Sequence, residues 1–147
     1  MKKILIIEDE PQVRNNIQEI LELADFDTLV SENGQQGLQL VKENKPDLII
    51  CDLMMPELDG YSLLTQLRQD ISTATIPLIF LTAKAERADL RRGMELGADD
   101  YLTKPFQPDE LLQSIAARLH KQEMLEQETQ QKLNDLRISI SNSLPHE

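Results

Sequence analysis

The segment Leu48-Ile49-Ile50-Cys51-Asp52-Leu53-Met54-Met55-Pro56-Glu57-Leu58-Asp59-Gly60 decides the fold. It opens with an apolar run of strand length, which ends at Asp52 and passes into a loop with turn-forming residues. Residues 60–69 then carry apolar side chains at three- and four-residue spacing, which predicts a helix. Cys51 is the only cysteine, and its place in the apolar run indicates a small buried core residue with no chemistry of its own.

The same alternation of strand and helix extends in both directions, as far as about residue 119. The apolar runs are residues 4–7, 26–30, 48–51, 78–81 and 101–102, and the amphipathic stretches are near 11–24, 34–44, 60–69, 86–96 and 108–119. Parallel strands need a crossover connection, and a helix is the usual one. The sequence therefore predicts an α/β fold, a doubly wound five-stranded parallel sheet with helices on both faces.

Polar residues follow the predicted strands at the edge where ligands bind in such sheets. Glu8 and Asp9 follow the first run, Asp52 the third, Thr82 the fourth and Lys104 the fifth. Each alone would be an ordinary turn, cap or surface residue, but together they form a cluster of carboxylates that needs a cation. Two carboxylates 4 Å apart repel by roughly 4 kcal/mol at an effective dielectric near 20. Mg²⁺, a hard ion that takes a few carboxylates and keeps its waters, fits best.

Composition limits the classes of function. The chain has 147 residues, enough for one domain with an extension, and a net charge of −11. A field of this sign repels phosphate backbones, so we expect no direct nucleic acid binding. No apolar run approaches the roughly 20 residues of a membrane span, and the short run after Met1 stops at Glu8 without a cleavage site. We therefore expect a cytoplasmic protein.

The sequence resembles the response-regulator receiver family over about residues 2–119. The resemblance rests on several motifs in family order: Glu8-Asp9, residues 52–60, Leu81-Thr82-Ala83, Gly97-Ala98-Asp99-Asp100-Tyr101 and Lys104-Pro105-Phe106. It implies a flavodoxin-like sheet and a two-component signalling switch, phosphorylated by a cognate histidine kinase or a phosphotransfer protein. It also implies that the domain promotes its own phosphotransfer and dephosphorylation, although the chain has no ATP-binding domain.

The resemblance assigns a role to each residue of the cluster. Asp52 is the expected phosphoacceptor. Mg²⁺ is expected on Glu8, Asp9, Asp52 and the backbone carbonyl of Met54. Thr82 and Lys104 are expected to engage the phosphoryl oxygens, with a cis bond between Lys104 and Pro105. Met54 and Lys84 occupy positions that modulate the phosphoryl lifetime. Thr82 and Tyr101 are expected to act as the switch that alters the surface of the last two helices and the last strand.

Residues 120–147 form a second region, predicted to be a helical linker. Between Pro108 and about Ser143 there is no Gly or Pro, which predicts one helix roughly 50 Å long. Its three- and four-residue seam indicates a coiled coil with a polar middle: Leu112, Ile115, Leu119, Gln122, Glu126, Thr129, Leu133, Leu136 and Ile140. We expect a parallel homodimer through this helix, although a solvated single helix is an open alternative.

The last residues, Ser143-Leu144-Pro145-His146-Glu147, resemble the start of the phosphoacceptor box of a histidine kinase dimerisation helix. On that interpretation His146 is a phosphoacceptor, and the chain is the first part of a hybrid sensor histidine kinase. The match is short, and a terminal His is otherwise simply exposed.

Three rival functions are tested by single positions. A pseudo-receiver acting only by protein contacts would not need an intact Asp52, Thr82 and Lys104. A dehalogenase-type phosphatase expects a second Asp two residues after its nucleophile, where this chain has Met54. A flavin carrier needs a phosphate-cradling loop after the first strand, and the acidic Glu8-Asp9-Glu10 excludes one.

Overall fold

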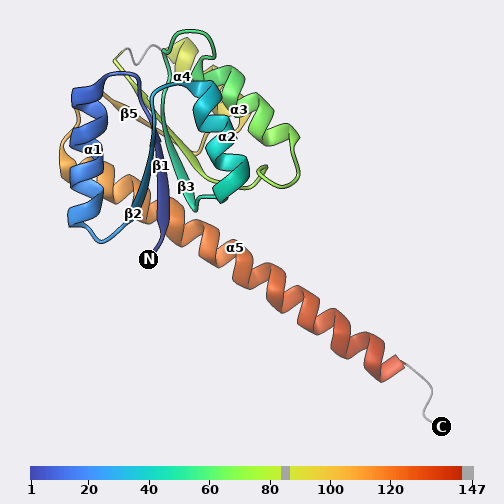
Figure 1. The fold of residues 1–147 in the computed structure, drawn as a ribbon. Coiled ribbons are helices and arrows are strands. Elements are labelled where there is room, and N and C mark those ends of the chain that lie inside the picture. Colours follow the sequence, from blue (N-terminus) through green and yellow to red (C-terminus); the bar gives the residue numbers. More distant parts are fainter. Residues whose placement is uncertain (84–86, 144–147) are drawn as a thin grey trace.

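The computed structural model describes residues 1–83 and 87–143, without the side chains of residues 87–89. Five parallel strands form one sheet, in the order β2-β1-β3-β4-β5 (Figure 1). Their bounds are β1 Lys3–Ile7, β2 Asp27–Ser31, β3 Leu48–Asp52, β4 Leu78–Thr82 and β5 Asp100–Thr103. The doubly wound parallel sheet predicted from the alternation is confirmed, and each strand lies within two residues of its predicted place.

The helices are α1 Pro11–Leu23, α2 Gly34–Asn44, α3 Gly60–Gln69, α4 Arg87–Leu96 and α5 Pro108–Ser143. α1 and α5 cover one face of the sheet, while α2 and α3 cover the other (Figure 1). Local signals fix several of the ends. Asn33 Oδ1 accepts a hydrogen bond from the Gln36 backbone N–H (2.8 Å), and Lys45 ends α2 in the left-handed region at φ 48°. Asn is a favoured N-cap residue, and helices often end at a left-handed residue, although glycine is more usual there than lysine.

The core consists of two apolar layers separated by the sheet. Side chains that alternate along each central strand enter opposite layers, so Ile50 packs with α1 and α5 whereas Ile49 and Cys51 pack with α2 and α3. All five residues of β3 are buried. Cys51 is fully buried as predicted. Burial is the main cause that raises the pKa of its thiol, and the negative charges of Asp52 and Glu8 raise it further. The thiol therefore stays protonated.

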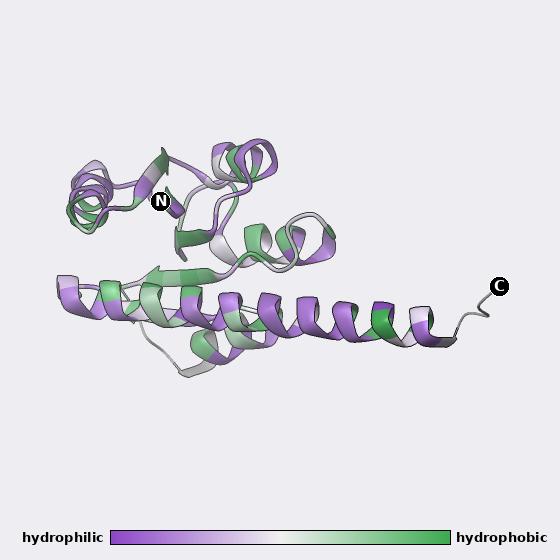
Figure 2. Cartoon of the chain, turned by 90° about the horizontal axis from the view of Figure 1, so that it is seen from below, coloured by the Kyte–Doolittle hydropathy of each residue, from purple (hydrophilic) through white to green (hydrophobic). Residues whose placement is uncertain are grey.

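α5 is one continuous helix of 36 residues, as the sequence predicts. Leu111, Ile115 and Leu119 are buried on the sheet. The C-terminal part of the helix projects away from the domain (Figure 1). The projecting part is mostly hydrophilic, with isolated apolar residues (Figure 2). Within the described part of the chain, no helix is both long enough and apolar enough to cross a membrane.

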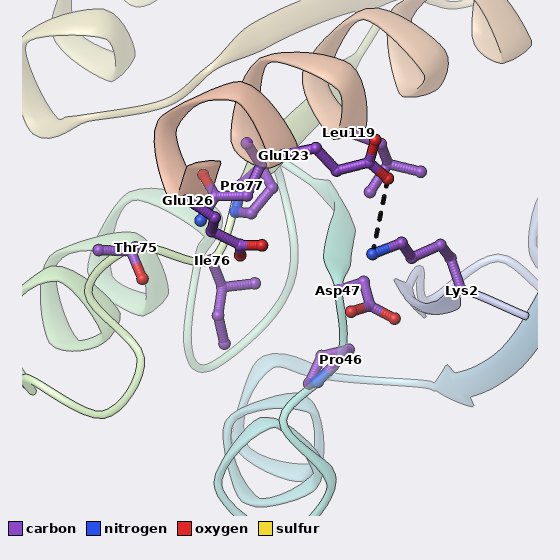
Figure 3. Close-up of a pocket in the computed structure, with 10 residues that line it drawn as sticks. Lys2, Pro46, Asp47, Thr75, Ile76, Pro77, Leu119, Glu123 and Glu126 are labelled. Carbon is purple, nitrogen blue, oxygen red and sulfur yellow. Dashed lines mark ion pairs between the residues drawn. The ribbon is translucent and has the colours of Figure 1, made fainter. Parts of the chain in front are cut away.

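A small pocket lies where α5 leaves the domain, at the end of the sheet opposite the carboxylate cluster (Figure 3). Lys2, before β1, and Glu123, on α5, form an ion pair across it at 3.8 Å. Both side chains are about half exposed, and exposed pairs of this kind contribute about 0–1 kcal/mol. This pocket holds no residue of the cluster, so we assign the chemistry to the other end.

Candidate functional site

The acidic pair after β1 is positioned by backbone contacts. Glu8 N–H donates to the Ser31 carbonyl (3.1 Å), and the Arg14 guanidinium donates to the Glu8 carbonyl (2.9 Å). The Glu8 side chain is completely buried, whereas Asp9 is partly exposed. A buried carboxylate needs a charged partner, since isolated ions are strongly disfavoured in low dielectric.

Asp52 ends β3 and is itself buried. The next residue continues the ladder, because Leu53 N–H donates to the Leu81 carbonyl at 2.9 Å. Gly60 N–H then donates back to the Leu53 carbonyl (3.0 Å). A Cβ on Gly60 would lie 3.0 Å from the Asp52 carbonyl oxygen and 2.7 Å from the Phe80 ring, so glycine lets α3 begin directly beside Asp52. These contacts fix the position of Asp52 between the end of β3 and the start of α3.

Thr82 and Lys104 complete the cluster from β4 and β5. Thr82 is buried at the end of β4, and its carbonyl accepts the Lys104 N–H at 2.8 Å. The peptide bond between Lys104 and Pro105 is cis, as the family resemblance implies. The Lys104 side chain extends to the carboxylates of Glu8 and Asp52.

The three carboxylates meet in one place. Carboxylate oxygens of Glu8, Asp9 and Asp52 lie within 4.8 Å of one another. Lys104 Nζ lies 2.5 Å from Glu8 Oε1 and 3.5 Å from Asp52 Oδ1. The convergence predicted from the strand ends is therefore present for all four residues.

The electrostatics of the cluster follow from burial and crowding. Burial raises the pKa of Asp52 to about 8, helped by a hydrogen bond and the charge of Glu8, while Lys104 acts in the opposite direction. Burial alone would lower the pKa of Lys104, but Glu8 and Asp52 outweigh it and raise that pKa. Among the described residues, Lys104 is the cation paired with these carboxylates, and the three carboxylates carry more negative charge than its one ammonium neutralises.

The donor set fits a small hard cation. Three carboxylates within reach of one point are the oxygen ligands that Mg²⁺ prefers, and one partly exposed member leaves room for water ligands. Met54, whose carbonyl the resemblance adds to the set, lies in the loop directly after Asp52 with its side chain turned to solvent.

Tyr101 is only partly exposed. Its ring is half-buried on β5 and packs against Phe80 at 5.5 Å between ring centroids. Phe80 in turn meets the Tyr61 ring edge-on at 5.8 Å. Two other predicted residues, Lys84 and His146, lie outside the described part of the chain.

Sequence reasoning missed two features around this site. One is an open groove of about 600 Å³ beside Lys104, lined by Glu10, Gln12, Val13, Asn16, Ala83, Lys104, Pro105 and Phe106. The other is a link between β5 and α5, where the Ser114 hydroxyl donates to the Asp100 carboxylate and Arg118 donates to the Asp99 carbonyl. The only sequence signal for the link was the spacing of polar residues on the inner side of α5.

Comparisons with known proteins agree with this geometry. The family model for the response regulator receiver domain matches residues 4–116. The phosphate regulon transcriptional regulatory protein PhoB of Pseudomonas aeruginosa is 44% identical over 120 residues, covering 82% of this chain and 52% of that protein. A putative response regulator from Chloroflexus aurantiacus is 35% identical with a TM-score of 0.78, covering 81% and 98%. A receiver domain of a histidine kinase from Syntrophus aciditrophicus is 36% identical with a TM-score of 0.76, covering 82% and 92%.

The chain belongs to the response regulator receiver family of two-component signalling. It spans about half the length of the curated relatives it matches, which are named as transcriptional regulators. Those relatives give no support to the expectation that the chain continues into a histidine kinase. Receiver domains bind Mg²⁺ and act with a cognate histidine kinase, and the acidic triad for the metal is present here.

Proposed function

We propose that the chain is a phosphorylation-dependent switch that accepts a phosphoryl group on Asp52 with Mg²⁺. The observation that carries the proposal is the meeting of Glu8, Asp9 and Asp52 within 4.8 Å, with the Lys104 ammonium 3.5 Å from Asp52. A pseudo-receiver would have no need for this charge arrangement. We place the switch in the cytoplasm, the usual compartment of the family.

The residues divide the work of phosphoryl transfer. An Asp52 carboxylate oxygen attacks phosphorus, the new O–P bond forms as the bond to the donor breaks, and the donor group leaves with its electron pair. Lys104 neutralises a phosphoryl oxygen, and the Thr82 hydroxyl donates a hydrogen bond to another. Glu8, Asp9, Asp52 and the Met54 carbonyl would hold Mg²⁺, which would supply positive charge for the remaining oxygens.

The groove beside Lys104 is the proposed docking place for the phosphodonor. Its wall contains apolar Val13 from α1 and Phe106 before α5, next to the open side of the cluster. A histidine-bearing kinase or phosphotransfer domain seated there would bring its phosphoryl group to Asp52. The state would then be relayed through the surface of α4, β5 and α5.

Phosphorylation by a small donor tests the proposal without a cognate kinase. With acetyl phosphate and Mg²⁺, intact mass should rise by one phosphoryl group in the wild-type chain and in Glu19→Gln, which changes an exposed carboxylate of α1 outside the cluster. It should not rise in Asp52→Asn. An unchanged wild-type mass under conditions that phosphorylate another receiver would favour the pseudo-receiver instead.

The projecting part of α5 supports a second proposal, a homodimer. Leu133, Leu136 and Ile140 form an apolar stripe that is about half exposed. Leu133 follows the buried Ile115 by about five turns of about 3.6 residues each, so the stripe continues the side on which α5 packs against the sheet. Pairing is therefore confined to the helix beyond the domain. Polar Gln122 and Thr129 weaken the seam and imply modest affinity. The parallel orientation stays a prediction.

A further inference from the structure

The hydroxyl end of Tyr101 lies in a space that only glycine leaves open. Gly93 is buried in α4, and a Cβ built on it would lie 1.4 Å from Tyr101 Oη and 2.6 Å from Cζ. Separations this short are far inside van der Waals contact, so the present ring position and any side chain at residue 93 exclude each other.

The Tyr101 ring also packs in a row of aromatic side chains. Phe80, which is fully buried, lies between Tyr101 and Tyr61. Arg92, the neighbour of Gly93, places its guanidinium carbon 4.4 Å from the centre of the Tyr61 ring. α4 therefore contacts both tyrosines through adjacent residues: Gly93 lies against Tyr101, and Arg92 lies against Tyr61.

The arrangement determines which group would move. Phe80 is enclosed in the core, so it cannot retreat from Tyr101. Tyr101 stands on the edge strand β5 and is half-buried, so a change of side-chain rotamer takes its ring toward solvent. A methyl group at position 93 would thus drive the tyrosine outward.

We propose that Gly93 is a positioning residue for Tyr101: it is the seat that makes the inward ring position available, and any larger residue holds Tyr101 outward. Glycine inside a helix is ordinarily unfavourable, and this seat gives a physical reason for one in α4. The consequence for signalling rests on the proposed function, because an inward Tyr101 matters only if Asp52 phosphorylation is coupled to it. The geometric claim stands without phosphorylation.

The chain offers a direct probe of the ring. It contains two tyrosines and no tryptophan, so in Tyr61→Phe the intrinsic fluorescence comes from Tyr101 alone. Acrylamide quenching should rise when Gly93→Ala is added to this variant. It should stay unchanged with Met94→Ala, a substitution at the next residue of α4, whose side chain is exposed. Equal quenching in the Gly93→Ala and Met94→Ala variants would overturn the proposal.

A double-mutant cycle covers the case in which α4 shifts or the variant folds poorly. Gly93→Ala should change the urea denaturation midpoint more unfavourably when Tyr101 is present than in a Tyr101→Ala background. In that background the space beside residue 93 is free. An identical change in the denaturation midpoint in both backgrounds would mean that the two residues are not coupled, and the seat would be wrong.

A last experiment distinguishes failure of this proposal from failure of the proposed function. With acetyl phosphate and Mg²⁺, the mass of the Tyr61→Phe chain and of its Gly93→Ala variant should rise equally, but only the former should show further shielding of Tyr101. If neither mass rises while the quenching difference persists, phosphorylation of Asp52 fails and the seat stands. If both masses rise and both chains become shielded alike, the seat is refuted and the phosphorylation is not.

Discussion

Lys104 Nζ lies 2.5 Å from Glu8 Oε1, which joins the loop after β5 to the end of β1 across the site. The Glu8 side chain is fully buried and that of Lys104 is 16% exposed, so this is an interior ion pair. The same ammonium is 3.5 Å from Asp52. One lysine therefore holds together a pocket whose carboxylates would otherwise repel one another.

Removing that ammonium should destabilise the fold. Lys104→Met leaves Glu8 buried without its partner, and breaking a buried pair costs about 3–5 kcal/mol, of which we expect the lower part because Lys104 is partly exposed. Urea denaturation at neutral pH measures the change. The double variant Lys104→Met, Glu8→Gln should recover much of the loss. A single variant as stable as wild type would show that the pair contributes little.

Stability without Mg²⁺ should depend on pH through Asp52. The ordinary pKa of an aspartate carboxyl is 3.8, and burial foremost raises the pKa of Asp52 to about 8 in the folded chain. Between these values the unfolded state releases a proton that the folded state keeps, so the free energy of unfolding falls as pH rises. Asp52→Asn should therefore be more stable than wild type, by a margin that grows up to about pH 8.

Thermal unfolding in EDTA at several pH values checks this dependence. Adding Mg²⁺ should narrow the margin, because a bound cation favours the ionised carboxylate. Glu19→Gln provides the matched control and should follow wild type throughout. A constant difference between Asp52→Asn and wild type across the range would contradict the assigned shift.

Asp9 should contribute to metal affinity. Asp9→Ala removes one hard oxygen ligand and one negative charge, and we expect Mg²⁺ binding to weaken by at least about tenfold, or ~1.4 kcal/mol. Isothermal titration calorimetry measures it, with Glu19→Ala as the variant of equal net charge. If the two variants bind alike, Asp9 belongs to a solvated turn.

The apolar stripe of α5 should determine association. Leu136→Glu places a charge on the proposed seam and should shift the chain to monomer. Ile138→Glu makes the same chemical change on the opposite side of the helix, where the exposed Ile138 would not contact a partner. Sedimentation equilibrium compares both with wild type and with a chain ending at Leu119. Monomers throughout would leave α5 as a single solvated helix.

The sequence could predict the contacts that follow from strand ends, but not those that depend on how distant elements pack. Asp9 and Asp52 could be placed together because each lies at or just beyond the carboxyl end of a strand, and parallel strands end at one edge. The pairing of Lys104 with Glu8 could not, because β5 and β1 are separated by two strands and only the folded side chains show the contact. Gly93 was invisible for a similar reason: its role depends on how α4 lies over β5.

Chemical trapping of the phosphorylated residue tests the central claim most directly. After incubation with acetyl phosphate and Mg²⁺, borohydride reduction converts an acyl phosphate to the alcohol, so an aspartyl phosphate becomes homoserine. Peptide mass spectrometry should locate homoserine at position 52 and at no other aspartate, and the signal should vanish when Mg²⁺ is withheld. Homoserine at Asp9 or elsewhere, with residue 52 still aspartate, would contradict the account.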